Sequence, residues 1–455
     1  MNINDKILYT VIISILGIIQ ATLALIINKK NKFTPAYSGF NFGMILYYII
    51  FPIYLLINLD NFIAYENSCT GYFCSNSINK FVIDIPSKNY FLYTFSILLF
   101  TLIFNFTYYI SRNMKTEKKK ISHINTIKAI KTIMYGCLIL GGISLMLFFS
   151  KFGGVKQALK YAEYMRSFAN DANDLIGGYE ILIIPARLVT VVPFLLVYLS
   201  ENDKSRKYNI EHIISIILTV CFYLYNAGRM PIICFLLCYI YMYIKGKFKN
   251  AWKIIILCGI FSLPLLDILD YLFVYLSTGS TQKLEINYIK YSMQFLYPFK
   301  NALNMSNIAA EYGYRFMKDY IITFLDLLPG ITYEPSYVNT SLYMSGPNWK
   351  VLGGTPNDLL TFSYLQLNLL GTVIISIVMA IYCNIMDKKL STLKESKTKK
   401  LFSAVISVYL FALIANFDFV ALIRSNVILV IISIAISIIG RSNSNENSIR
   451  NINTD

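Results

Sequence analysis

Charged residues are scarce in this sequence. They make up 15% of the 455 residues, whereas hydrophobic residues make up 56%. A soluble domain ordinarily carries about a quarter charged residues, so the composition excludes a chain of soluble domains. Apolar stretches of roughly 17 to 25 residues recur from end to end, and each is long enough to cross a hydrocarbon core as an α-helix. The sequence therefore predicts an all-α polytopic membrane protein.

Histidine is nearly missing, and no metal-binding spacing of cysteines is present. The two histidines are His123, in a basic loop, and His212, at the start of an apolar span, and both fall on the side assigned below to the cytoplasm. The outer side therefore has no imidazole for a general base or a metal ligand, and we predict no metal and no cofactor. Of the eight cysteines, Cys69 and Cys74 lie in an external loop, where a disulfide and two free thiols both remain open.

Acidic residues are outnumbered by basic ones, which gives a net charge of +16. Such an excess can indicate nucleic-acid binding, but no nucleic-acid-binding motif accompanies it. Membrane proteins collect Lys and Arg in cytoplasmic loops, and this alone accounts for the excess. We therefore predict membrane lipids, and no nucleic acid, as partners.

Eleven spans are predicted, with the N-terminus outside and the C-terminus in the cytoplasm. Every second connection is short and densely basic, as cytoplasmic loops are; examples are the loops at 112–131 and 388–400. The loops at 59–89 and 277–357 are then extracytoplasmic. The spans lie near residues 7–27, 40–58, 90–111, 131–150, 180–200, 210–226, 230–245, 251–276, 358–385, 401–417 and 425–440.

The spans divide the chain into four predicted parts. An eight-span bundle covers 1–276, a large extracytoplasmic loop covers 277–357, three spans follow over 358–440, and a disordered cytoplasmic tail covers 441–455. The large loop is rich in aromatic and apolar residues, and its sequences YIKYSMQFLYPF and RFMKDYIITFLDLLPG predict amphipathic helices. We expect these helices to form an ordered cap over the outer face.

Arginines are the main candidates for a site on the outer side. Arg229 stands between two apolar spans, where Gly228 allows a tight turn and Pro231 suits the first turn of the next helix. It either reaches water from a hairpin tip or binds an anion beside a helix N-terminus. The other outer arginines are Arg166, Arg187, Arg315 and Arg424. Five arginines on one side favour a polyanionic ligand such as a pyrophosphate, although each could be a structural ion pair.

Carboxylates on the same side are candidates for a general base. Asp358 is the first choice and Glu334 the second. The full set on or near the outer side comprises Asp267, Asp270, Glu285, Glu311, Asp319, Glu334 and Asp358.

Three segments resemble one family. KFGGVKQALKYAEYMRSF at 151–168 has a Gly-Gly turn before an amphipathic helix with an arginine; NAGRMP at 226–231 is an arginine hairpin; GGTPNDLLTFSYLQLNLLG at 353–371 enters a late span with an aromatic residue, Tyr364, and a closing glycine. Together they resemble the Wzy-type polymerases of O-antigen, capsule and exopolysaccharide repeat units. Members often carry a Glu just before the aromatic residue; here that position is Phe362, and the nearest acid is Asp358.

The resemblance implies a function, a location and partners. It implies a metal-independent glycosyltransferase of GT-C-like architecture in a bacterial cytoplasmic membrane. This enzyme would transfer a glycan from undecaprenyl pyrophosphate to a new lipid-linked repeat unit at the outer face, alongside a flippase and a chain-length regulator. Arg229, Arg315 and Asp358 would be catalytic, and the substrate would be bound by Arg166, Arg187, Arg424, Glu334 and Tyr364.

Other functions remain open. A lipid-linked oligosaccharide flippase would place polar residues along a central pathway, whereas this chain places much of its mass in one external loop. An O-antigen ligase is expected to use an external histidine, which the chain lacks, and neither histidine suits a membrane acyltransferase.

Overall fold

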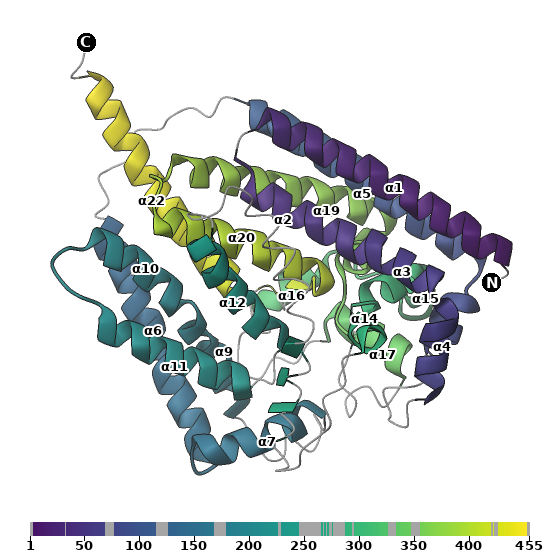
Figure 1. Ribbon diagram of the computed structural model, residues 1–455, viewed down its shortest axis with the longest axis horizontal. Helices are drawn as coiled ribbons and strands as arrows, with labels where there is room; N and C mark the ends of the chain where they lie inside the picture. The colour runs from purple at the N-terminus through teal and green to yellow at the C-terminus, as the bar shows by residue number, and fades with distance from the viewer. Residues whose placement is uncertain are drawn as a thin grey trace. The chain divides into compact units, whose positions relative to one another are not determined.

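The computed structural model describes most of the chain as helix (Figure 1). The residues that it describes are 3–31, 33–68, 77–114, 126–167, 179–225, 229–244, 265–266, 268–269, 271–272, 275, 287–293, 295–325, 334–346, 355–419, 422 and 426–452. Every element assigned among these residues is helical. The chain is thus an all-helical protein over its described part, as its composition predicts.

Seven helices are long and apolar enough to cross a membrane. Their bounds are Asp5–Lys30, Pro35–Ile57, Ser87–Asn113, Thr126–Lys151, Ile183–Asn202, Leu359–Thr392 and Lys397–Ala415. Three shorter apolar helices cover Asn209–Tyr225, Met230–Tyr243 and Val427–Gly440. These ten helices correspond to ten of the predicted spans, and the chain is a multi-pass membrane protein. The remaining span, 251–276, lies almost wholly outside the described residues, so the count of eleven stays a prediction, as does the GT-C-like arrangement.

The contacts between residues divide the chain into two compact units, and each unit combines segments that are distant in the sequence. Unit 1 comprises Met1–Met114, Asn287–Ile385 and Leu410–Leu422, and unit 2 comprises Lys115–Ile286, Met386–Tyr409 and Ile423–Asp455. The predicted division at 276, 357 and 440 follows the membrane topology, and it stays a prediction.

Unit 1 is built from helices of the N-terminal region and of the predicted large loop. Within it, α1 packs against α2, α3 and α5 (Figure 1). Its elements are α1 (Ile3–Lys30), α2 (Pro35–Ile45), η1 (Leu46–Ile50), α3 (Phe51–Ile57), α4 (Leu59–Ser68), η2 (Asn79–Ile83), α5 (Ser87–Asn113), α14 (Tyr288–Met293), α15 (Tyr297–Tyr312), α16 (Lys318–Leu325), α17 (Ser336–Ser345), most of α19 (Leu359–Thr392) and the end of α20 (Lys397–Ala415).

The second apolar span contains a π-helical turn, η1, which ends two residues before Pro52. Proline has no N–H, so the carbonyl of Tyr48, four residues earlier, lacks its ordinary helical donor. The Tyr93 hydroxyl from α5 donates to that carbonyl instead, at 2.7 Å. The proline thus explains the local irregularity, and the irregular turn carries Tyr48 into the site described below.

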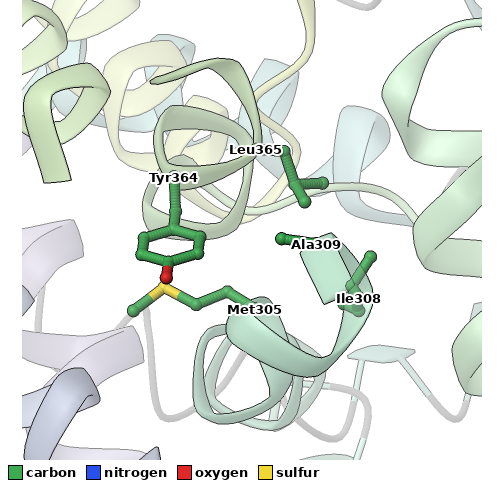
Figure 2. Packing of buried hydrophobic residues seen from close by; sticks show 5 residues of the cluster. All are labelled: Met305, Ile308, Ala309, Tyr364 and Leu365. Carbon is green, nitrogen blue, oxygen red and sulfur yellow. The ribbon is translucent and has the colours of Figure 1, made fainter. Parts of the chain in front are cut away.

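Within the predicted large loop, α14 and α16 lie in the two segments predicted to be amphipathic, 288–299 and 315–330, whereas most of α15 lies between them and was not predicted. The longest of them, α15, is not confined to a surface: Phe299, Leu303 and Ile308 are fully or almost fully buried. α15 packs against α5 and α17. Figure 2 shows Met305, Ile308 and Ala309 of α15 facing Tyr364 and Leu365 of α19, which form one apolar cluster. The loop therefore contributes to the core of unit 1 and fixes the beginning of α19.

Unit 2 centres on α6 (Thr126–Lys151), which packs against α9 and α10. A Cβ on Gly141 would lie 2.8 Å from the Val189 nitrogen, so this glycine permits the close approach of α6 to the 183–190 segment. The other elements are α7 (Val155–Ser167), η3 (Tyr179–Leu182), α9 (Ile183–Ala186), η4 (Arg187–Thr190), α10 (Val192–Asn202), α11 (Asn209–Tyr225), α12 (Arg229–Ile244), the end of α19, most of α20 and α22 (Val427–Ile452). α22 extends into the tail that the sequence predicts to be disordered.

Candidate functional site at a broken helix

The helix α19 is broken in its first third. Leu367 (φ −150°, ψ 36°) and Asn368 (φ 57°, ψ −145°) have non-helical backbone angles. The chain turns sharply there, because a Cβ on Gly371 would lie 2.0 Å from the carbonyl oxygen of Ser363, eight residues earlier. Only a residue without a side chain fits this approach. α19 is therefore two helices, over 359–366 and 369–392, with an irregular corner between them.

The loop between α15 and α16 binds the exposed end of the first of these helices. The backbone N–H groups of Arg315 and Phe316 donate to the carbonyls of Leu365 and Gln366, at 2.8 and 2.9 Å. In an unbroken helix these two carbonyls would accept from N–H groups four residues later. Irregular backbone at membrane depth is tolerated only where protein or a water-filled cavity satisfies it. Here the N–H groups of the α15–α16 loop, which carries Arg315, satisfy the two carbonyls.

The Arg315 side chain donates to a carboxylate and to a backbone carbonyl beside the break. Its Nε and Nη2 atoms both lie 3.3 Å from Oδ1 of Asp319, and Nη2 also donates to the backbone carbonyl of Glu334. The other oxygen of Asp319, Oδ2, accepts from Nε2 of Gln366 at 2.6 Å. Asp319 is fully buried, whereas 18% of the Arg315 side chain is exposed. A partly exposed guanidinium is thus anchored to a buried carboxylate.

Tyr320 extends this cluster along the first part of α19. Its ring lies 5.7 Å from that of Phe362 and 5.0 Å from that of Phe419, measured between centroids. Burial raises the pKa of the Tyr320 hydroxyl, and the nearby carboxylates of Asp319 and Asp418 raise it further. The hydroxyl therefore stays protonated at physiological pH.

Asp358 caps the N-terminus of α19. Its Oδ1 accepts from the N–H groups of Leu360 and Thr361, at 3.0 and 3.2 Å, and from the Tyr48 hydroxyl at 2.6 Å. Its Oδ2 accepts from the Thr361 hydroxyl. The side chain is fully buried. A carboxylate at this position satisfies helix N–H groups and is favoured by the helix dipole.

The segment that carries Asp358 is fixed by polar side chains of the large loop. From α15, Asn301 donates to the Pro356 carbonyl at 2.9 Å. From α17, Ser341 donates to the Thr355 carbonyl at 2.9 Å, and the hydroxyls of Ser336 and Thr340 both bind the Asn357 side chain. The large loop thus places the start of α19 as well as its break.

The structure places Arg315 and Asp358 at opposite ends of one short helix. Eight residues separate Asp358 from Gln366, and at 1.5 Å per residue they span about 12 Å. The two predicted catalytic residues therefore belong to one element of unit 1 without touching each other. Their catalytic roles stay predictions.

Glu334 and Tyr364 are found beside the same helix. The Glu334 side chain is exposed, and its backbone carbonyl, rather than its carboxylate, meets Arg315. Tyr364 is buried against Met305 (Figure 2), and its hydroxyl lies 3.4 Å from that of Tyr314. Tyr364 thus helps to bind α15 to α19, and its contact with substrate stays a prediction.

The other predicted site residues belong to unit 2. Arg187 is half-buried at the start of η4, where its carbonyl accepts from the Thr190 hydroxyl at 2.7 Å. Arg229 is the first residue of α12, as its hairpin motif predicts, and Arg166 lies in α7; both side chains lie outside the described part of the structure. Arg424 lies wholly outside it, as do Cys69 and Cys74. The structure does not relate these residues to Arg315.

Gln366 and Tyr48 are among the site residues that were not predicted from the sequence. Gln366 and Tyr48 lie within apolar spans, and a polar residue at membrane depth is a candidate for function by default. That signal was present for Gln366, because it is the one amide side chain between residues 358 and 367. Tyr48 offered no such signal, because the sequence contains 36 tyrosines.

Among the described residues, no three His, Cys, Asp or Glu side chains gather as metal ligands would. Comparison of the chain with protein-family models, with curated proteins and with solved structures found no match.

Proposed function

We propose that this protein is a glycosyltransferase that polymerises lipid-pyrophosphate-linked oligosaccharide repeat units at the outer face of a bacterial cytoplasmic membrane. The observation that carries the proposal is Arg315, a guanidinium fixed at the break of a membrane helix by a buried carboxylate. The resemblance of three segments to Wzy-type polymerases supports it, and so does the multi-pass helical fold.

The chemistry of the reaction explains why an arginine matters. When the glycan leaves undecaprenyl pyrophosphate, negative charge develops on the leaving group, and a fixed cation stabilises that charge. The planar guanidinium fork matches phosphate oxygens in a way that a lysine ammonium does not. We propose that Arg315 grips the pyrophosphate. The resemblance to Wzy-type polymerases separately assigns substrate contacts to Arg229 of the NAGRMP hairpin and to Arg166, Arg187 and Arg424.

The test replaces Arg315 and Arg229 in cells and measures the ladder of surface-glycan lengths. Arg→Ala at either position should abolish long chains, and Arg→Lys should shorten them, because the charge remains but the two-pronged geometry is lost. Arg206 offers a matched control, since it also pairs with an acid, Glu211, but lies in a predicted cytoplasmic loop. Arg206→Ala should leave the ladder unchanged. A full ladder from Arg315→Ala at normal protein abundance would refute the role of Arg315.

A lipid-linked oligosaccharide flippase is the second candidate, because broken helices also occur in transporters, where they bind the cargo near the membrane midplane. Deletion of the gene separates the two functions. Loss of long chains with single repeat units still present at the surface supports a polymerase, whereas loss of all surface repeat units supports a flippase.

A further inference from the structure

We propose that Asp319, held by Gln366, is the positioning residue for Arg315. The inference rests on the proposed function, since it concerns how Arg315 is kept ready for a pyrophosphate. In this arrangement Asp319 does not touch the substrate. It fixes the plane of the guanidinium, and it ties that plane to the break in α19.

The hydrogen bonds define the orientation of both side chains. Nε and Nη2 of Arg315 share one edge of the guanidinium, and both meet the same oxygen, Oδ1 of Asp319. The second oxygen of Asp319 is occupied by Gln366. A carboxylate bound at both oxygens cannot rotate freely. The plane of the guanidinium that it binds is therefore fixed in one orientation. A carboxylate bound to Arg315 alone would leave this direction free.

Asp319 is itself placed by two separate elements. It is the second residue of α16, in the first helical turn, where the helix dipole favours a carboxylate. Gln366 belongs to the other element, α19, and makes one hydrogen bond to α16 and one to the Arg315 loop. Its side chain holds Asp319, and its carbonyl accepts from the Phe316 N–H. A shift of the α19 corner would therefore move the guanidinium directly.

The acid of this pair is more deeply buried than its cation, as is also the case in Lys131–Asp203 and Arg206–Glu211. Asp319 is fully buried while Arg315 remains partly exposed, so the cation is the accessible member of the pair. Another pair with the same sequence spacing, Glu395 and Lys399, has its acid largely exposed instead. Placement matters for catalysis, because a misplacement of about 1 Å can cost on the order of 10²-fold in rate.

The experiment measures chain elongation in membranes that contain the full-length protein, supplied with repeat-unit lipid extracted from a strain in which the gene is deleted. Asp319→Asn should lower the elongation rate by roughly 10²-fold. Gln366→Met, which removes the amide donor at similar length, should lower it by a smaller factor. The matched control Glu395→Gln removes the acid of the exposed pair and should leave the rate unchanged.

Two further readouts separate positioning from a structural role. In an Arg315→Ala background, Asp319→Asn should cause no additional loss, since residues that act through each other are non-additive. Free guanidinium added to Arg315→Ala should restore part of the rate, and Asp319→Asn should raise the guanidinium concentration needed. A structural role instead predicts additive losses and an unchanged guanidinium requirement, and either result would overturn the inference.

The proposed function and this inference fail in different ways. A normal rate from Arg315→Ala would refute the role of Arg315 and, with it, both proposals. A low rate from Arg315→Ala together with a normal rate from Asp319→Asn would leave the function standing and overturn the inference alone. If Asp319→Asn does not reach the membrane at normal abundance, Gln366→Met takes its place: a lowered elongation rate supports the inference, and a normal rate overturns it.

Discussion

At the scale of single residues, Gly371 sets the geometry on which the site depends. The carbonyl oxygen of Ser363 occupies the place where a side chain would begin. Asn368, at the corner, takes a positive φ that is uncommon for a residue with a side chain, and such angles persist only where the surrounding structure enforces them. The corner is thus maintained by packing rather than by local preference.

Gly371→Ala should lower the stability of the protein. The added methyl group must displace backbone rather than a flexible side chain, and overpacking of this kind costs about 1–3 kcal/mol. Thermal unfolding of the purified protein in detergent measures the effect. The control is Gly136→Ala in α6, where a Cβ would meet nothing within 4 Å and where alanine should raise helix stability by up to about 1 kcal/mol. Equal unfolding temperatures for Gly371→Ala and the wild type would contradict the tight corner.

At the scale of elements, the short helix at 359–366 joins the two ends of the site. Asp358 caps it and Gln366 ends it, while α15, α16 and α17 hold its flanks through side chains that are distant in sequence. Asp358 accepts a hydrogen bond from Tyr48, 310 residues earlier. The capping role and the predicted role as a general base make different demands on the same carboxylate.

Asp358→Asn separates these two roles. Asparagine is as good an N-cap as aspartate, so thermal unfolding should stay close to that of the wild type, whereas Asp358→Ala should cost about 1–2 kcal/mol. If Asp358 is also the base, Asp358→Asn should lower polymerisation by about 10²–10⁴-fold. Normal glycan lengths from Asp358→Asn at normal abundance would assign the residue to capping alone, with Glu334 as the next candidate for the base.

At the scale of the whole molecule, the proposed function requires the large loop to face outward. The alternation of basic connections predicts this orientation, with 277–357 outside and 112–131 in the cytoplasm. The arginines of the proposed site lie on the outer side in that scheme. The orientation is therefore the premise that a topology experiment should test first.

Single cysteines in an otherwise cysteine-free chain test the orientation with a membrane-impermeant thiol reagent on intact cells. Glu311→Cys, at an exposed position of α15, should be labelled, and Lys120→Cys should be labelled only after the cells are opened. The opposite pattern would invert the topology, and a site for outer-leaflet substrates could not then be formed by Arg315.

Much of the fold was predictable because its signals are local. Length and apolarity of successive segments identify ten described helices, and the pattern of the large loop predicts α14 and α16 but not most of α15. Pro231 and Gly228 likewise place the start of α12 at Arg229. These predictions rest on two general rules only: exposing backbone polar groups to lipid is costly, and a helix has a fixed periodicity.

The sequence by itself determined that the chain is helical, that it crosses a membrane repeatedly, and that arginines and carboxylates are candidates for its site. Only the tertiary structure decided which of them meet. The break in α19 falls at Leu367 and Asn368, and Gly371 permits it, but a glycine within an apolar span does not by itself predict a break. The burial of α15 likewise depends on partners in α5 and α17. Asp319 became the partner of Arg315 because the α15–α16 loop satisfies carbonyls that the break exposes. A hydrogen bond between distant segments cannot be predicted from the residue spacing within either segment.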